Sequence, residues 1–363
     1  SPLDLCQIAY TSGTTGRSKG VMVPHNRIVQ TGRSLARVRR IGSEDVLYTP
    51  LPLFHNNARY ITLMPALAVG AKVEFGLRFS ASGFFDEVRR CEATQFNYLG
   101  VMIAILNKQE PSERDRDHRL SLGWGAGAPK DIVETFEERF GVSLIEGYGL
   151  TEAGIPLSNL PGDRRIGSCG RAINSYDVQL LDEHDNPVEV GEVGEITIRP
   201  ELPYTTMLGY FKMPEETLQT FRNLRIHTGD LARQDEDGFF YFVDRSKDAI
   251  RRRGENISSQ EIEAAVNEHP AVLESAAVPV PSEVTEDDVM IVVTTQPGRE
   301  LGEAELLEHC RGAMPSFWVP RYFRIGAEAL PRTPTNKIEK HKLKAAGTDG
   351  AWDREAVAAE GSR

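Results

Sequence analysis

Residues 10–20, YTSGTTGRSKG, combine glycines, hydroxyl side chains and one lysine in a single short loop. Backbone N–H groups that glycine leaves accessible, hydroxyl donors and an ammonium group together favour an anion, above all a phosphate. The loop does not follow the spacing of the common phosphate-binding loop, G-x-x-x-x-G-K-[ST], because Lys19 is followed by Gly20 instead of a hydroxyl residue. Clusters of glycine, serine and threonine are also typical of surface linkers. Taken alone, the loop indicates either a phosphate binder of another kind or a linker.

Four further stretches of unusual composition follow: GAGAP at 125–129, GYGLTEAG at 147–154, HTGDLARQDEDGFFYFVDRSKD at 227–248 and PRTPTNKIEKHKL at 331–343. In this order, and with the opening loop, they resemble the motifs of the adenylate-forming (AMP-dependent synthetase/ligase) superfamily. That family includes acyl-CoA synthetases, adenylation domains of peptide synthetases and firefly luciferase. GENISSQEIE and PTNKIEKHKL are similar to crotonobetaine/carnitine-CoA ligase-like members. The resemblance covers nearly the whole chain, although the family's N-terminal portion, which precedes the phosphate loop, is expected to be absent.

The resemblance implies an enzyme that joins a carboxylic acid to the α-phosphate of ATP and releases pyrophosphate. The acyl group then passes from acyl-AMP to coenzyme A. Such chemistry needs donors for the departing phosphates, Mg²⁺ and a positive charge at the reacting oxygens. By resemblance, the opening loop wraps the β- and γ-phosphates of ATP with Thr11, Ser12, Gly13, Thr14, Thr15, Gly16 and Lys19.

In GYGLTEAG, the resemblance implies that Tyr148 offers a flat face to adenine, with Gly147 and Gly149 leaving room beside it. Thr151 would donate to the α-phosphate. Glu152 would be a ligand of Mg²⁺, which prefers hard oxygen atoms. The alternative for this stretch is a strand–turn–helix junction that Thr151 caps.

Other contacts to the nucleotide and to coenzyme A are implied at scattered positions. Asp230 would accept the two ribose hydroxyls, and Arg245 would be the second ribose contact. An isolated Asp or Arg is more often a solvated surface charge, so their order within the motif carries the prediction. Gly254 would border the pantetheine tunnel. The backbone that lines adenine would come from Gly125, Ala126 and Gly127.

Lys337, on a predicted loop near the C-terminus, would bridge the substrate carboxylate and the nucleotide. Asn336 stands where the family commonly has glycine, and Asn tolerates the same left-handed backbone conformation. The alternative for Lys337 is one solvated lysine among several. Lys247 takes the hinge position about which the small domain would turn between the two steps. His55 would lie near the path of the carboxylate and the thiol.

The substrate acid is not identified by the sequence. PLFHNN at 52–57 is not followed by the aspartate-containing pattern that binds an amino group, which favours an acid without an α-amine. Asn56, Asn57 and Arg59 make the expected pocket edge more polar than a fatty-acid channel. Two alternatives stay open: a protein that loads a carrier protein instead of coenzyme A, and a nucleotide-binding fragment without full activity.

The sequence pattern of the segments that must position these residues predicts an α/β fold. Short apolar runs alternate with helical patterns over 21–160, which is typical of parallel βα units. We expect this α/β part to span 1–162, an antiparallel, barrel-like β subdomain to span 163–246, a mobile α+β domain to span 247–345 and a flexible tail to span 346–363. LDLCQIAY, at 3–10, predicts a buried strand that pairs with elements further along or with sequence absent from the chain.

The composition of the 363 residues agrees with a small-molecule enzyme. A formal net charge of −11 argues against nucleic acid or an anionic membrane as the main partner. No apolar run approaches the length of a membrane span. The four cysteines are widely scattered, which predicts neither a zinc site nor a disulfide framework and favours a reducing cytoplasm. The expected partners are the acid, ATP and coenzyme A, and a homo-oligomer stays open.

Overall fold

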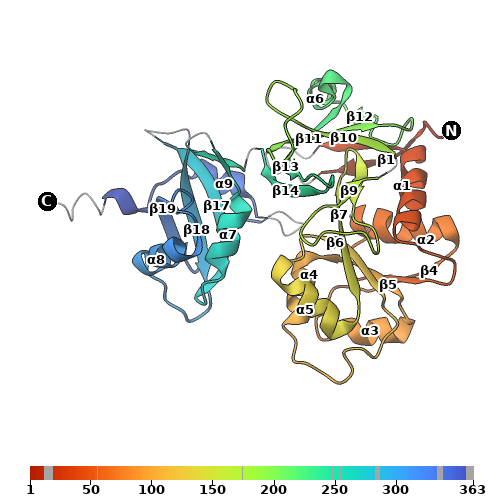
Figure 1. Ribbon diagram of the computed structural model, residues 1–363, viewed down its shortest axis with the longest axis horizontal. Coiled ribbons are helices and arrows are strands. Elements are labelled where there is room, and N and C mark those ends of the chain that lie inside the picture. Colours follow the sequence, from red (N-terminus) through yellow and green to blue (C-terminus); the bar gives the residue numbers. More distant parts are fainter. Residues whose placement is uncertain are drawn as a thin grey trace. The chain divides into compact units, whose positions relative to one another are not determined.

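The computed structural model describes residues 1–11, 19–54, 56–173, 175–246, 248–252, 255–282, 287–332 and 338–356. The chain divides into two compact units, shown in Figure 1. Unit 1 comprises Ser1–Thr11, Gly20–Thr228 and Ala232–Phe242, and unit 2 comprises Ser12–Lys19, Gly229–Leu231 and Val243–Arg363. The predicted α/β class is confirmed.

The centre of unit 1 is a seven-stranded sheet with the order β4-β3-β5-β6-β7-β8-β9. The first five strands in this order are parallel, and β8 and β9 are antiparallel to their neighbours. The strands are β3 (Val46–Thr49), β4 (Lys72–Phe75), β5 (Gln95–Leu99), β6 (Leu122–Ala126), β7 (Ser143–Leu150), β8 (Gly154–Ser158) and β9 (Arg171–Ala172). The parallel βα arrangement predicted for this part of the chain is therefore confirmed.

Helices cover both faces of this sheet, so the alternate side chains of its strands are buried on either side. On one face, α3 (Phe84–Cys91), α4 (Gly100–Asn107) and α5 (Lys130–Phe140) enclose an aromatic core around Phe84, Phe96 and Phe136. On the other face, α1 (His25–Val38) and α2 (Met64–Val69) pack against residues that include Leu47 and Trp124. A π-helix, η1 (Asn57–Leu63), leads directly into α2.

Two smaller antiparallel sheets complete the first part of the chain. One has the order β1-β2-β12 and contains β1 (Leu5–Tyr10), β2 (Gly20–Pro24) and β12 (Gly209–Tyr210). The other has the order β10-β11-β13-β14 and contains β10 (Tyr176–Leu181), β11 (Gly194–Pro200), β13 (Ile226–Gln234) and β14 (Phe240–Arg245). A helix, α6 (Pro214–Thr220), and a 3₁₀ turn, η2 (Arg222–Leu224), lie between β12 and β13 in sequence. The second of these sheets was predicted as the antiparallel β subdomain.

The prediction for the first strand, that it is buried and pairs with elements further along the chain, is confirmed for the pairing and wrong for the burial. β1 pairs antiparallel with β2, the strand that follows the opening loop, with Tyr10 opposite Gly20. The strand is also at the edge of its sheet, so it is not buried: Leu5 is 45% exposed and Tyr10 is 71% exposed. The loop between β1 and β2 thus connects two neighbouring strands, which the apolar pattern of 3–10 alone did not reveal.

Unit 2 contains a four-stranded sheet with the order β17-β18-β19-β20 and a hairpin of β15 (Ile250–Arg252) and β16 (Glu255–Ile257). Ser258 caps α7, accepting a hydrogen bond from the backbone N–H of Glu261 at 3.3 Å. The elements of the domain are α7 (Ser259–Asn267), β17 (Val272–Pro281), β18 (Asp287–Thr295), α8 (Glu303–Ala313), β19 (Tyr322–Gly326), α9 (Lys340–Ala345) and β20 (Trp352–Asp353).

The stretch from residue 346, predicted as a flexible tail, is partly integrated into this sheet. β20 pairs antiparallel with β19, and Arg321 donates to Asp353 at 3.0 Å. The ring of Trp352 contacts that of Phe323 edge to face, with centroids 5.6 Å apart. The apolar ring and the carboxylate thus each have a partner on the neighbouring strand, while 357–363 lie outside the described residues. Among the helices of the described ranges, none combines the length and apolar character that a membrane crossing requires.

Candidate active site

The turn between β7 and β8 carries the two residues predicted to act on the α-phosphate and Mg²⁺. β7 ends at Leu150 and β8 begins at Gly154, whose φ of +94° lets the chain reverse within three residues. Thr151 and Glu152 are half-buried in this turn, at the carboxyl end of a strand of the central sheet, where open α/β sheets bind their ligands. A strand follows the turn, so the alternative of a helix capped by Thr151 is wrong.

Side chains from distant parts of unit 1 fix both residues of the turn. The side-chain N–H of Asn56 donates to Thr151 Oγ1 at 2.9 Å, and the Tyr210 hydroxyl donates to Glu152 Oε1 at 2.8 Å. The Tyr176 hydroxyl donates to the next carbonyl, that of Ala153, at 2.9 Å. Burial, together with the neighbouring Glu152 charge, raises the pKa of Tyr210, so its hydroxyl keeps its proton and remains a donor.

The polar residues expected at the edge of the acid pocket bind one another and neighbouring strands. Arg59 donates to Asn56 Oδ1 at 3.3 Å and to Gln7 Oε1 at 2.7 Å. The side chain of Asn57 accepts from Asn97 on β5. These hydrogen bonds therefore support the position of Thr151, whether or not the same side chains also contact an acid.

The GAGAP loop begins at the carboxyl end of the neighbouring strand, β6, where Ala126 and Gly127 are exposed. Gly125 is buried, and an added Cβ there would lie 2.4 Å from Cδ2 of Tyr98. At Gly100, the first residue of α4, an added Cβ would lie 1.6 Å from the carbonyl oxygen of Gly127. The packing of the sheet thus already requires glycine at position 125. It also requires glycine at position 100, which the motif did not reveal.

Glu146 on β7 was not recognised in the sequence, yet it fixes the GAGAP loop. Its Oε1 accepts the backbone N–H of Ala128 at 2.9 Å. Burial raises the pKa of the Glu146 carboxyl above its ordinary value of 4.5, and hydrogen bonds from the backbone of Ala128 and Gly127 act in the opposite direction. The sequence signal that could have identified Glu146 was a carboxylate directly before the GYGLTEAG motif, four residues before the end of a buried strand.

Tyr148 was expected to present its ring to adenine. Its side chain packs in a core cluster that includes Val38, Leu157 and Ile173, and only 8% of the residue is exposed. The two flanking glycines differ in exposure: Gly147 is buried and Gly149 is exposed. The part of Tyr148 that could contact a nucleotide is therefore small.

In unit 2 the structure brings together the two residues predicted to bind ribose. Arg245 Nε lies 3.5 Å from Asp230 Oδ1. Asp230 is buried, whereas the Arg245 side chain is 36% exposed. Asp230 and Arg245 thus belong to unit 2, whereas Thr151 and Glu152 belong to unit 1.

Other predicted residues can be placed only in part. Thr11 and Lys19, at the two ends of the opening loop, are half-buried. The following lie outside the described residues: Ser12, Gly13, Thr14, Thr15, Gly16, His55, Lys247, Gly254 and Lys337.

The Glu152 carboxylate fits the way in which enzymes hold Mg²⁺ together with a nucleotide. In the described part of the chain, no group of three or more His, Cys, Asp or Glu side chains converges to hold a metal ion. Mg²⁺ keeps several waters and is commonly held by one or two carboxylates plus substrate phosphates. A single carboxylate next to the Thr151 hydroxyl, as Glu152 is, fits this donor set.

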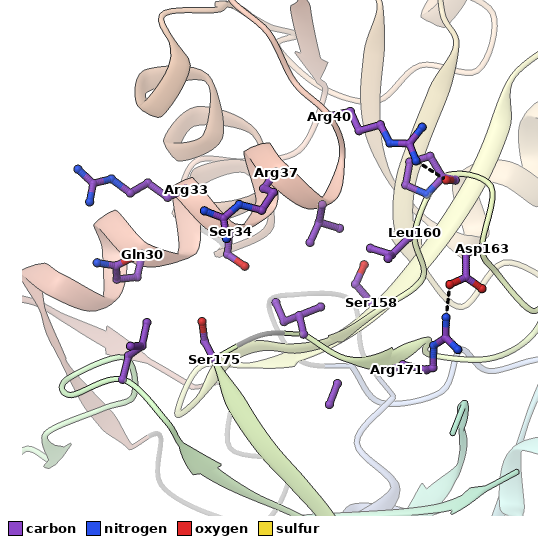
Figure 2. Close-up of a pocket in the computed structure, with 15 residues that line it drawn as sticks. Gln30, Arg33, Ser34, Arg37, Arg40, Ser158, Leu160, Asp163, Arg171 and Ser175 are labelled. Carbon is purple, nitrogen blue, oxygen red and sulfur yellow. Dashed lines mark hydrogen bonds and ion pairs between the residues drawn. The ribbon is translucent and has the colours of Figure 1, made fainter. Parts of the chain in front are cut away.

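A cavity of about 460 Å³ in unit 1 lies between α1 and the β8–β9 segment, as Figure 2 shows. Its wall includes Arg37, Arg40 and Arg171. Figure 2 also shows Arg40 bonded to a neighbouring backbone carbonyl and Arg171 paired with Asp163. None of the predicted site residues lines this cavity, so it is distinct from the candidate active site.

Comparisons with known proteins agree with the motifs. Residues 1–211 match the family described as AMP-binding enzyme, and residues 261–337 match the AMP-binding enzyme C-terminal domain. The chain is 34% identical over 345 residues to the crotonobetaine/carnitine–CoA ligase of Salmonella typhimurium strain LT2, covering 94% of this chain and 66% of that protein. It therefore spans 66% of the length of this curated relative.

Solved structures of similar proteins include complexes with nucleotides. ATP-bound MatB from Rhodopseudomonas palustris is 28% identical, with a TM-score of 0.84 over 95% of this chain and 69% of that chain. The o-succinylbenzoate CoA synthetase MenE from Bacillus subtilis, in complex with the acyl-adenylate intermediate OSB-AMP, is 26% identical, with a TM-score of 0.85 over 95% of this chain and 70% of that chain.

The buried carboxyl of Glu146 predicts a specific pH dependence of stability. Because its pKa is raised in the folded state, the folded protein holds the proton more tightly than the unfolded chain. Its contribution is fully present below pH of about 4.5 and is lost as the pH rises through the folded pKa. We expect Glu146→Gln to remove this loss, so that the variant gains stability relative to the parent protein as the pH rises.

The measurement is the free energy of unfolding in urea at a series of pH values from about 4 to about 8. Glu134→Gln, at an exposed position on α5, is the matched control and should follow the parent protein. A difference between the parent protein and Glu146→Gln that does not change with pH would contradict the assigned effect of burial.

Proposed function

Because the chain belongs to the AMP-binding enzyme family, we propose that it is an AMP-forming acyl-CoA synthetase, an acid–thiol ligase. It activates a carboxylic acid as acyl-AMP, with release of pyrophosphate from ATP, and then transfers the acyl group to coenzyme A. The observation that carries the proposal is the turn between β7 and β8, in which a hydroxyl donor and a carboxylate stand next to each other.

The role of this turn follows from the charge that develops during acyl transfer to a phosphate. Thr151 would donate to an oxygen of the α-phosphate, and its hydroxyl is oriented by the side-chain N–H of Asn56. Glu152 would hold Mg²⁺ through one carboxylate, of which one oxygen is fixed by the Tyr210 hydroxyl. The ion supplies charge neutralisation at the phosphate oxygens when it is bound.

The remaining nucleotide contacts are proposed from the family resemblance and from the pair in unit 2. Asp230 can accept two adjacent ribose hydroxyls because a carboxylate has two oxygens, and Arg245 restricts its orientation from 3.5 Å away. The loop from Thr11 to Lys19 would hold the β- and γ-phosphates. Lys337 would bring a positive charge to the carboxylate and the α-phosphate as the bond between them forms.

The acid is proposed only as a class. The curated relative is named for crotonobetaine and carnitine, and the structural relatives include an o-succinylbenzoate CoA synthetase. For this chain we propose a carboxylic acid without an α-amino group, with coenzyme A as the acceptor. If the protein instead loads a carrier protein, the acceptor of the acyl group changes and the first step, formation of acyl-AMP, stays the same.

Pyrophosphate exchange with a panel of carboxylic acids tests the first step, and thioester formation with and without coenzyme A tests the second. We expect exchange that depends on one class of acid, on ATP and on Mg²⁺, and thioester formation only with coenzyme A. Exchange without thioester formation would redirect the proposal to a carrier-protein acceptor. An absence of exchange with every acid would overturn the proposed function.

Glu152→Gln should weaken the dependence on Mg²⁺ specifically, because the amide keeps the shape of the side chain but loses the charge. We expect the Mg²⁺ concentration that gives half-maximal exchange to rise about tenfold, which corresponds to the loss of one charged ligand. Glu215→Gln, at an exposed acid on α6, is the control and should titrate like the parent protein. An unchanged Mg²⁺ titration of Glu152→Gln would exclude Glu152 from the metal site.

Lys337→Ala should slow adenylation strongly, by about a hundredfold or more, because one charge that stabilises the transition state is removed. Formation of the thioester from supplied acyl-AMP should persist, since that step no longer needs this charge. Lys344→Ala, at an exposed lysine of α9, is the control for loss of a positive charge in the same region. Equal loss of both steps in Lys337→Ala would contradict its assigned role.

A further inference from the structure

Arg27 is a buried arginine that points at the turn between β7 and β8. It lies in the first turn of α1 and is only 1% exposed. One terminal nitrogen, Nη1, donates to the carbonyl of Thr151, and the other, Nη2, donates to the carbonyl of Leu150 at 3.3 Å. A single guanidinium therefore binds two consecutive peptide groups of the turn that carries the candidate phosphate and metal ligands.

The positive charge of Arg27 is not matched by a bound carboxylate. In the described part of the chain, no carboxylate lies within salt-bridge distance of its guanidinium, and Nε has no hydrogen-bond partner. The ring of Tyr60 lies 5.9 Å from the guanidinium carbon and offers only a weak compensation. Burying an unpaired charge is costly, so a residue that only had to tie down a turn would not need to be charged.

The two carbonyls belong to the peptide groups whose N–H atoms are those of Thr151 and Glu152. A positive donor at the oxygen of a peptide group draws electron density away from its N–H and makes that N–H a stronger donor. Neither N–H donates to an acceptor within the residues that the structure describes. Both are therefore available to an anion, with a buried positive charge behind them.

We infer that Arg27 is a positioning residue that gives this turn its affinity for a phosphate group. It holds the carbonyls of Leu150 and Thr151, and its buried charge strengthens the N–H donors of Thr151 and Glu152 toward the α-phosphate. The inference rests on the proposed function, which places the α-phosphate at Thr151. Its distinctive consequence is that Arg27 acts on the phosphate and not on the nucleoside.

The same helix offers a matched control. Arg39, the residue that follows α1, is also only 1% exposed, and it donates to Gln95 Oε1 at 3.1 Å and to the carbonyl of Ile61. It thus ties α1 to β5 and η1, and it makes no contact with the turn between β7 and β8. Loss of Arg39 reports the effect of removing a buried guanidinium from unit 1 without touching the candidate phosphate site.

The experiment compares the binding of AMP and of adenosine, which differ by the phosphate, to the full chain by isothermal titration calorimetry. We expect Arg27→Met to weaken AMP binding by about tenfold, as the loss of charge-assisted hydrogen bonding implies, and to leave adenosine binding unchanged. Arg39→Met should keep the parent ratio of AMP to adenosine affinity. A circular dichroism spectrum of each variant confirms that it is folded.

If Arg27→Met does not fold, Arg27→Lys carries the test. Lysine keeps the charge, but its compact ammonium group cannot reproduce the fork that spans two carbonyls, so AMP affinity should fall by about threefold with adenosine affinity unchanged. An AMP-to-adenosine ratio that stays at the parent value in the folded Arg27 variants would overturn the inference alone. A parent protein that binds neither AMP nor adenosine would overturn the proposed function and the inference with it.

Discussion

The candidate site depends on how a turn of three residues, 151–153, is held in one conformation. Without contacts to other elements, the turn between β7 and β8 would leave its polar backbone groups without partners. The side chains of Thr151 and Glu152 would then also lack a defined direction. Asn56 and Tyr210 orient the side chains of Thr151 and Glu152. These bonds tie the turn to the start of η1 and to β12, so that elements outside the hairpin fix the direction of both side chains.

The central sheet also explains why residues so far apart in sequence form one site in unit 1. Parallel strands β5, β6 and β7 end at the same edge, so that the start of α4, the GAGAP loop and the turn after β7 are neighbours. The carboxyl of Glu146 and the absence of a side chain at Gly100 set how closely these three segments approach. The packing of the sheet by itself therefore already requires glycine at positions 100 and 125.

The division of the chain into two units distributes the proposed nucleotide contacts between them. Thr151 and Glu152 belong to unit 1, whereas Asp230, Arg245 and the loop from Ser12 to Lys19 are assigned to unit 2.

The sequence alone determined the α/β class, the parallel βα rhythm and the family, because each of these follows from local periodicity or from the order of short motifs. It could not place β1 at a sheet edge beside β2, or reveal that Trp352 and Asp353 form a strand, because pairing depends on partners distant in sequence or on the path of a loop. Only the tertiary structure decided that Arg27, Tyr176, Tyr210 and Glu146 support the site. Their roles arise from contacts between elements, and a buried arginine looks the same in a sequence as a solvated one.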